Sequence, residues 1–448
     1  MSSSAPRVIV VGGGIGGLAL AQALVRAGID VQVHERNASP EGWLHGYRIN
    51  INPHGARALH DCLPPALWKA FVATSATPPG GITFRTETLA ELFTLTRADM
   101  IGGSTDAADG QYGVSRMVLR RLLLAGLDDV VRFGAEFERY TVEPDGQVTA
   151  HFADGSTATG DVLVGADGAN SRVRTQLLPH AGRVATGATT IAARLPLTDD
   201  TRAWLPDFLT DGMALVMPAS GSWTVFTSAF PGRDTVAGAL TGGLDLAGLG
   251  IDRDALLDTV DDYVLCALIA DTRSLPTHLH DLDGPALAGV AAGMLDGWHP
   301  VLRRIYAECD PATVAPLVVQ QSRTVDPWPS SAVTVLGDAV HNMSPVGGLG
   351  ANTALRDAAE LARQLIAVRN GAPLVPSIGA YEQRMREWGY AALREAASNT
   401  RRATTSNRLS RHAGRTYFRV RRILRGGPDA PLGSGRSGDR SYPAGTRG

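Results

Sequence analysis

The sequence predicts an α/β protein with a Rossmann-like nucleotide-binding domain, an inserted domain built on a mainly antiparallel sheet, and a C-terminal helical segment. Residues 8–37 follow the order strand, glycine-rich turn, helix, strand, which indicates a βαβ unit. Residues 183–237 alternate apolar and polar side chains, as strands of a sheet with two unlike faces do. Residues 377–424 are expected to be helical.

Composition limits the class of protein. The chain has 448 residues, 44% of them hydrophobic, so two domains are expected. A net charge of −2 gives no overall attraction to nucleic acid. Cys62, Cys266 and Cys309 have no metal-ligand spacing, so we expect free, mostly buried thiols, a reducing compartment and no metal. The first residues, MSSSAPR, lack an apolar signal core, which favours a soluble cytoplasmic protein.

The N-terminal elements follow from hydrophobic runs and helix signals. Residues 8–11 are apolar and β-branched, as a buried parallel strand should be. A helix is expected over 18–27, ended by Gly28, and a second strand over 31–35. Asn52 and Pro53 are placed to open a helix that runs to Leu63. The expected elements further on are strands within 73–99, a helix from Ser115, two hairpins turning at Asp145-Gly146 and Asp154-Gly155, and a buried strand over 162–165.

The second half of the sequence predicts helices over 252–275, 298–308 and 353–369, and a strand over 332–336. The last residues are rich in Gly, Pro, Ser and Arg and cannot bury enough apolar surface to become ordered. The expected division is 1–72, 100–182 and 276–376 for the nucleotide-binding domain, 73–99 and 183–275 for the substrate domain, 377–424 for a C-terminal helix and 425–448 for a disordered tail.

The glycine-rich turn carries the first functional signal. Gly12, Gly14 and Gly17 satisfy G-x-G-x-x-G. Gly12 permits the tight turn, Gly14 lets the backbone approach a pyrophosphate, and Gly17 lets the helix pack on the strand. Glu35 ends the second strand, where a carboxylate accepts both ribose hydroxyls and disfavours a 2′-phosphate. The turn therefore predicts a dinucleotide without distinguishing NAD from FAD.

Two later stretches make that distinction. In VLVGADGANSRVR, Asp167 and Gly168 follow a buried strand. In VTVLGDAVHNMSPVGGLGANTALRDAAELA, Asp338 ends a strand and a glycine-rich loop, 347–350, leads into a helix. A carboxylate at a strand end can bond a polyol hydroxyl, and loop and helix amides stabilise negative charge. This combination suits the ribityl chain and the anionic reduced ring of a flavin.

These stretches resemble the single-component FAD-dependent aromatic hydroxylases, built like para-hydroxybenzoate hydroxylase, over most of residues 8–370. The family signature GDAAH…P…G-G-x-G-x-N…DA falls on Gly337, Asp338, Ala339, His341, Pro345, Gly348, Gly350, Asn352, Ala354 and Asp357. Leu349 departs from the glutamine that the family often has, so a polar contact near the flavin is absent or replaced. The resemblance gives His341 a structural role in the loop rather than a role in proton transfer.

The resemblance implies a set of FAD contacts. Arg116 matches an arginine that opens a helix and contacts the diphosphate and ribose; Arg48 resembles an arginine near the mobile flavin, with a surface ion pair as the alternative. The expected cofactor-binding residues are Gly12, Gly14, Ile15, Gly16, Gly17, Glu35, Arg36, Arg48, Arg116, Asp167, Gly168, Gly337, Asp338, Pro345, Gly348, Leu349, Gly350, Ala351 and Asn352.

The resemblance also implies an activity: NAD(P)H reduces FAD, O₂ adds to give a flavin C4a-hydroperoxide, and one oxygen hydroxylates or epoxidises a hydrophobic aromatic or polyketide-like molecule of secondary metabolism. No second G-x-G-x-x-G turn lies between a predicted strand and a predicted helix, so NADH or NADPH is expected to bind transiently, unlike in the two-nucleotide-domain Baeyer-Villiger class. An FAD-dependent dehydrogenase or reductase without oxygen insertion is the alternative, and a non-catalytic flavin protein is a third hypothesis.

Several residues are candidates for substrate contact. The expected pocket residues are Met213, Val216, Trp223, Phe226 and Pro345. His45, His54 and Tyr112 are candidates for assisting deprotonation of a phenol or enol, and Arg48 is a further catalytic candidate. Each of these four also fits an ordinary surface, capping or ion-pair role.

The C-terminal region is strongly basic, with nine arginines and no acidic residue between positions 401 and 425. An anionic partner, such as membrane headgroups or a carrier protein, is one interpretation. The favoured interpretation is a helix packed over the FAD domain through Leu409, Tyr417, Val420 and Leu424.

Overall fold

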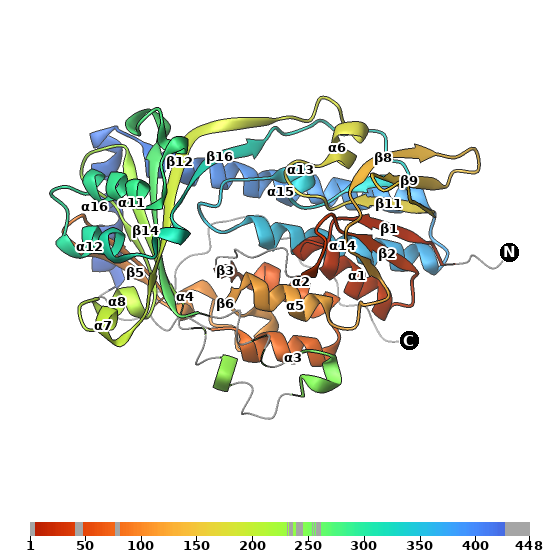
Figure 1. The fold of residues 1–448 in the computed structure, drawn as a ribbon, viewed down its shortest axis with the longest axis horizontal. Helices are drawn as coiled ribbons and strands as arrows, with labels where there is room; N and C mark the ends of the chain where they lie inside the picture. Colours follow the sequence, from red (N-terminus) through yellow and green to blue (C-terminus); the bar gives the residue numbers. More distant parts are fainter. Residues whose placement is uncertain are drawn as a thin grey trace.

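A computed structural model describes residues 5–40, 48–76 and 81–425, apart from 231, 233–235, 239–244, 253, 255 and 257–260. The chain forms two large sheets that lie at opposite ends of an elongated molecule (Figure 1). Residues 426–448, where the disordered tail is predicted, lie outside the described residues, as does His45.

The first sheet is the predicted Rossmann-like sheet, and all its strand pairs are parallel. Its order is β17 (Val333–Val335), β11 (Val162–Gly165), β1 (Val8–Val11), β2 (Val31–His34) and β7 (Val131–Arg132). Every residue of β1, β11 and β17 is buried, which explains the apolar sequences of β1 and β11. The one polar residue of these buried strands, Thr334 of β17, donates a hydrogen bond to Glu382. The packing helices are α1 (Ile15–Arg26), α2 (Pro53–Cys62), α5 (Arg116–Leu124) and α14 (Gly350–Arg369).

Smaller strands and helices surround this sheet, and they include the two hairpins that the Asp-Gly turns predicted. The two Asp-Gly turns connect an antiparallel meander of β8 (Phe137–Val142), β9 (Val148–Phe152) and β10 (Thr157–Gly160). Asn52 caps α2 by accepting a hydrogen bond from the Gly55 N–H. The remaining elements here are β3 (Arg48–Ile51), β6 (Tyr112–Ser115), α3 (Pro65–Thr74), α6 (Arg172–Leu177) and α13 (Asp338–His341).

The second sheet has seven strands and is mainly antiparallel, as predicted; only β13 and β4 pair in parallel. Its order is β16 (Ala315–Ser322), β12 (Arg183–Pro196), β15 (Tyr263–Asp271), β14 (Trp223–Phe230), β13 (Met213–Val216), β4 (Ile82–Arg85) and β5 (Glu91–Leu95). One face packs on α7 (Asp199–Arg202), α8 (Asp207–Thr210), α11 (Gly284–Met294) and α12 (Pro300–Glu308), and forms a second hydrophobic core.

The helix predicted over 252–275 is wrong, because Tyr263–Asp271 is strand β15 in the middle of this sheet. Leu268 points into the second core, while Leu265 and Ala267 point to the other face. Both faces are covered, so the strand is apolar throughout and shows no alternation. The elements α11, α12 and β16 also accompany this sheet, although their residues fall within the predicted range 276–376; the domain boundaries stay a prediction.

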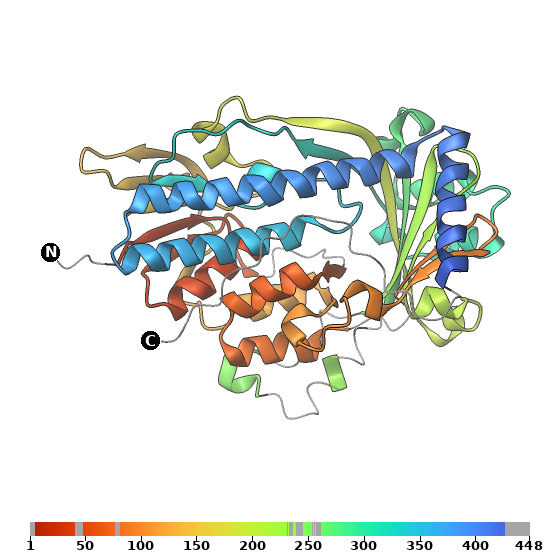
Figure 2. The same cartoon turned by 180° about the vertical axis from the view of Figure 1, so that it is seen from behind.

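The C-terminal segment is two helices rather than the single one predicted over 377–424. Helix α15 (Leu374–Thr404) spans 31 residues and runs along both sheets (Figure 2). Its Tyr381 hydroxyl donates to the carbonyl oxygen of Val335 on β17, and its Ala403 carbonyl accepts from Thr224 of β14. Helix α16 (Arg408–Arg425) then turns across β5, so the predicted packing over the FAD domain is wrong.

The predictions of free, buried cysteines are confirmed for Cys62, Cys266 and Cys309. Among the described residues, no helix combines the length and the apolar character needed to cross a bilayer.

A core truncation tests the placement of β15. Replacing Leu268, which is fully buried, with Ala should lower the free energy of unfolding by about 2–5 kcal/mol, because it leaves a cavity in the second core. The matched change Val142→Ala, at a half-exposed position of β8, should shift it by less than about 0.5 kcal/mol. Urea unfolding followed by far-UV circular dichroism measures both; equal stability of the two variants would contradict this register.

Candidate functional site

One large cavity lies between the two sheets. Its volume is about 1710 Å³, larger than the roughly 300–1,000 Å³ of ordinary small-molecule sites. The cavity extends from the glycine turn that follows β1 to the face of the seven-stranded sheet opposite the second core. It can therefore hold a large cofactor and a second ligand together.

The glycine turn at one end is closely packed except at Gly14. Gly12 has a φ of +111°, and a Cβ built on it would lie 2.4 Å from the Ala166 carbonyl oxygen. A Cβ on Gly17 would lie 2.2 Å from the Gly12 carbonyl oxygen. A Cβ on Gly14 would meet nothing within 4 Å, although Gly14 begins α1 and lines the cavity. The turn thus leaves an open cradle at the N-terminus of a helix, where an anion is stabilised.

Glu35 lies beside this cradle at the end of β2. It is almost fully buried, and its Oε2 accepts a hydrogen bond of 2.8 Å from the Gly13 N–H. Oε1 accepts a bond of 2.9 Å from the Asn37 N–H. Two backbone donors fix the carboxylate, which also lines the cavity with Arg36 and can accept hydroxyl protons from a ligand.

Asp167 adds a second fixed carboxylate. Its Oδ2 accepts from the N–H groups of Arg172 and Val173 at 2.8 and 3.3 Å. Its Oδ1 is buried and has no hydrogen-bond partner among the described residues. Burial raises the pKa of this carboxyl group, and hydrogen bonds from Ser171 and the nearby backbone oppose that rise. An unsatisfied buried acceptor at the cavity wall is the place for a ligand donor.

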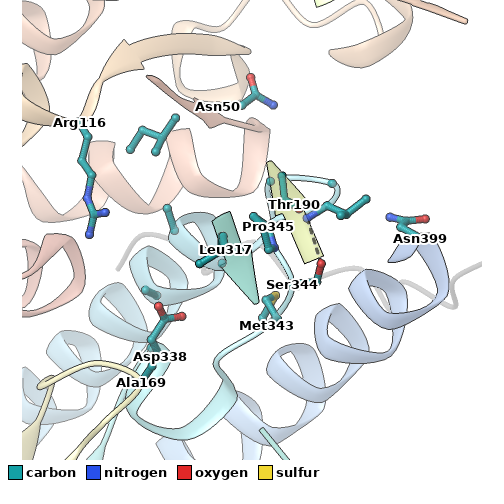
Figure 3. Close-up of a pocket in the computed structure, with 18 of the residues that line it drawn as sticks. Asn50, Arg116, Ala169, Thr190, Leu317, Asp338, Met343, Ser344, Pro345 and Asn399 are labelled. Carbon is teal, nitrogen blue, oxygen red and sulfur yellow. Dashed lines mark hydrogen bonds between the residues drawn. The ribbon is translucent and has the colours of Figure 1, made fainter. Parts of the chain in front are cut away.

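Asp338 and Arg116 reach the same cavity from different elements (Figure 3). Burial raises the pKa of Asp338, while the charges of His341 and Arg116 act in the opposite direction. Burial lowers the pKa of Arg116, and the charge of Asp338 raises it. The two side chains supply one acceptor and one cation to the middle of the cavity.

A buried pair beneath Asp338 fixes its position. The distance from His341 Nε2 to Asp357 Oδ2 is 2.5 Å, and both side chains are inaccessible to solvent. Asp357 also accepts from the Gly337 N–H at 2.9 Å and from Trp388 Nε1 at 2.8 Å. Burial acts to lower the pKa of His341, but the Asp357 carboxylate raises it overall. His341 does not line the cavity; its contacts hold the turn that presents Asp338.

The loop 345–350 and the start of α14 form the next part of the wall. Pro345, Gly348, Gly350 and Ala351 line the cavity, and α14 begins without a side-chain cap. Leu349 and Asn352 were expected to contact the cofactor but do not line the cavity. Asn352 instead donates through Nδ2 to the carbonyl oxygens of Asn50 and Gly348 and accepts from the Asn52 N–H. It ties the loop to β3, so its contribution is to position the loop.

The far half of the cavity is apolar. The pocket-facing side chains of neighbouring strands form rows, because cross-strand partners share a face. One row contains Ala192, Ala267, Phe226, Leu215 and Phe84, in that order across five strands. Helices α15 and α16 close this half with Asn399, Arg402, Arg411, Tyr417 and Phe418. Met213, Phe226 and Pro345, three of the residues predicted for the substrate pocket, line the cavity; their contact with a substrate stays a prediction.

Val216 and Trp223 do not line the cavity, so these two pocket predictions are wrong. Val216 is fully buried in the second core, and Trp223 packs against that core. Side chains alternate between faces along a strand, so Leu215 takes the position expected for Val216.

Among the catalytic candidates that the structure describes, Arg48 alone lines the cavity. Its Nη1 donates to Ser228 Oγ at 2.8 Å and to the Ala229 carbonyl oxygen, and burial lowers its pKa to about 10. His54 is exposed at the first turn of α2, and the Tyr112 hydroxyl donates to the Ala107 carbonyl oxygen at 2.7 Å. Neither of them lines the cavity, so their predicted catalytic roles are withdrawn.

Comparison with known proteins agrees with this geometry. Residues 10–74 match the model of an NAD(P)-binding Rossmann-like domain, and residues 307–396 match the model of an FAD binding domain. An FAD-containing monooxygenase structure from Photorhabdus luminescens subsp. laumondii is 33% identical, with a TM-score of 0.76, over 89% of this chain and 98% of that one. The chain belongs to the FAD-dependent monooxygenases.

Two curated relatives place the chain within that family. The dual O-methyltransferase/FAD-dependent monooxygenase elcB of Phaeosphaeria nodorum is 34% identical over 400 residues, which is 83% of this chain. The chain spans only 42% of the length of that relative. The 6-hydroxynicotinate 3-monooxygenase of Pseudomonas fluorescens is 25% identical over 90% of this chain and 92% of its own length.

FAD is the cofactor of this family, and the residues present fit it. The open cradle at Gly14 suits a pyrophosphate, and the free Oδ1 of Asp167 suits a hydroxyl or amide donor. Both groups are contributed by loops at the carboxyl ends of parallel strands, where α/β sheets bind nucleotides.

Sequence analysis missed several lining residues. Thr190 and Leu317 face each other on β12 and β16, and only the strand register reveals this. Asn399 and Arg402 come from the end of α15, beyond the part of the chain in which the motifs occur. No local signal marks these four positions (Figure 3 labels three of them).

A matched pair of glycine substitutions separates binding from folding. Gly14→Ala should leave the apoprotein melting temperature unchanged, because its methyl group meets nothing, yet weaken FAD binding at least about tenfold by filling the cradle. Gly17→Ala should lower apoprotein stability by about 1–3 kcal/mol through its clash with the Gly12 carbonyl. Thermal melts and FAD titrations check both. Unchanged FAD affinity in Gly14→Ala would show that the cradle is not the pyrophosphate site.

Proposed function

We propose that this chain is an NAD(P)H- and O₂-dependent flavoprotein monooxygenase that hydroxylates or epoxidises a hydrophobic aromatic or polyketide-like molecule. The observation that carries the proposal is a single continuous cavity, polar at the nucleotide end and apolar at the other. Such a cavity brings a flavin and an apolar substrate into one enclosed space.

The proposed cofactor contacts divide along the cavity. Gly12, Gly14, Glu35 and Arg36 would hold the ADP half of FAD. Asp167, Gly168, Arg116 and Asp338 would hold the pyrophosphate and ribityl region, and Pro345 with Gly348, Gly350 and Ala351 would lie next to the ring. All of these residues line the cavity.

When bound, FAD accepts electrons from NADH or NADPH and supplies the oxygen chemistry. The protein binds the ring, orients the substrate and excludes water. The start of α14, which has no side-chain cap, favours negative charge at the adjacent cavity wall. The Arg48 guanidinium, held by Ser228 and Ala229, adds a fixed positive charge at the boundary between the two halves.

The substrate half supports an apolar ligand. Phe84, Phe226, Leu215 and Ile269 present carbon surface, and Thr190 contributes a buried hydroxyl without a partner among the described residues. A mostly apolar wall with a small number of polar groups orients a ring that carries a hydroxyl or carbonyl. One relative is a 6-hydroxynicotinate 3-monooxygenase, which fits an aromatic substrate. The free cysteines fit a cytoplasmic location, which we include in the proposal.

Isotope labelling tests the reaction type. With ¹⁸O₂, NADPH or NADH and a panel of hydroxylated aromatics and polyketide-like compounds, the product should gain one labelled oxygen atom, because oxygen transfer uses O₂. Mass spectrometry measures the incorporation, and nicotinamide oxidation without substrate gives the background. A product that forms equally well without O₂ and contains no label would instead support the dehydrogenase or reductase alternative.

Filling the apolar half tests the location of the substrate. Ala267 lies in the middle of the pocket-facing row, and Ala267→Phe should lower kcat/KM at least about tenfold because the new ring occupies substrate space. FAD content should stay unchanged. Ala286→Phe, at an exposed position of α11, is the matched control. Equal kcat/KM in the two variants would place the substrate elsewhere.

A further inference from the structure

Helix α16 is anchored to the protein by one face. Arg411 on that face is almost fully buried and donates to the carbonyl oxygens of Gly221, Trp223, Ala403 and Thr405. The Phe418 ring stacks on Phe84 with centroids 4.1 Å apart. Arg415 pairs with Glu87, Arg425 pairs with Asp99, and Arg422 donates to the Glu91 carbonyl oxygen. The helix is therefore held in a fixed orientation.

The opposite face carries bulky apolar side chains that nothing covers in the described structure. The exposed fractions are 81% for Leu409, 72% for Ile423, 69% for Leu424, 55% for Tyr417 and 46% for Val420. By helical spacing, Leu409, Val420, Ile423 and Leu424 lie on one side of α16 and form one stripe, with Tyr417 at its edge. Half of the large hydrophobic residues that are exposed in the described chain belong to this 18-residue helix. The stripe is therefore an exposed hydrophobic patch, the kind of surface that marks an interaction site.

Cations border the stripe. By helical spacing, Arg408 and Arg419 lie along one of its edges, and they form no ion pair with the described residues. No acidic residue occurs between positions 401 and 425. The carboxylates that pair with α16, those of Glu87 and Asp99, lie on its inner face. The outer face of α16 is therefore apolar at its centre and positive at its edge.

We propose that the outer face of α16 docks on an anionic lipid bilayer, with the helix lying in the interfacial plane. An exposed helix with bulky aliphatic residues on one side and arginines around them is the form that inserts into acidic headgroups. A second copy of the chain fits less well, because a two-fold pair of antiparallel α16 helices would bring the Arg408 and Arg419 edges against each other.

The location of α16 gives this contact a consequence. Tyr417 and Phe418 of the same helix line the apolar half of the cavity. Docking through α16 would therefore hold that half of the cavity next to the bilayer surface, where apolar small molecules accumulate. The inference concerns binding to lipid and stands independently of the reaction proposed above.

Vesicle flotation tests the proposal with the FAD-loaded full chain. Vesicles of phosphatidylcholine with phosphatidylglycerol should carry the protein upward in a density gradient, whereas vesicles of phosphatidylcholine alone should not. The bound fraction should fall at least about tenfold in Leu409→Ser/Ile423→Ser, which removes apolar insertion, and in Arg408→Gln/Arg419→Gln, which removes charge attraction. Val142→Ser/Val375→Ser, at exposed apolar positions on β8 and α15, is the matched control and should bind as the unchanged protein does.

The outcomes that overturn the proposal are distinct. They are absence of binding to the acidic vesicles, binding that survives the Leu409/Ile423 change, and loss of binding in the Val142/Val375 control. A wild-type dimer that becomes a monomer in the Leu409/Ile423 variant, seen by light scattering, would assign the stripe to a contact between copies. Melting temperature and FAD content, measured for every variant, ensure that a misfolded protein is not scored.

Discussion

The site depends on the register of the parallel sheet. Val11 of β1 lies opposite both Gly165 of β11 and His34 of β2, and Gly165 lies opposite Val335 of β17. Four strands therefore end at the same level. The residues that follow them, which include Gly12, Glu35, Asp167 and Asp338, must emerge at one edge of the sheet. Segments separated by more than three hundred residues in sequence become one binding surface because backbone hydrogen bonds fix that register.

Three carboxylates at one edge repel each other, and the structure supplies compensation locally. Glu35 and Asp167 accept backbone N–H groups, and Asp338 shares the cavity with Arg116. The buried His341 and Asp357 pair acts differently, because it fixes the Gly337 turn from below. Asp357 raises the pKa of His341 above 6.5, the value of the histidine in the unfolded chain. The pair therefore contributes its full stabilisation at pH values below 6.5, and this contribution is lost as the pH rises through the higher pKa of His341 in the folded protein.

Local chemistry explains what the sequence could predict. The glycine turn, the Asn52 cap and the Asp-Gly hairpins each depend on residues a few positions apart, and the structure contains all of them. Interior strands lack such a signal: β15 is apolar on both faces, so periodicity could not separate it from a helix. Val216 was misplaced because the face that a strand residue takes depends on a register set by distant partners.

The two halves of the cavity differ in how the chain builds them. The nucleotide half is built by backbone turns at strand ends, which leave little freedom for substitution at Gly12 or Gly17. The substrate half is built by side chains on the face of a sheet and by two C-terminal helices, so side chains such as Ala267 and Phe226 determine its shape. Because α15 hydrogen-bonds to β17 through Tyr381 and to β14 through Ala403, one helix fixes the distance between the halves. Cofactor binding and substrate selection thus depend on different residues, and α15 holds these two sets of residues at a fixed distance.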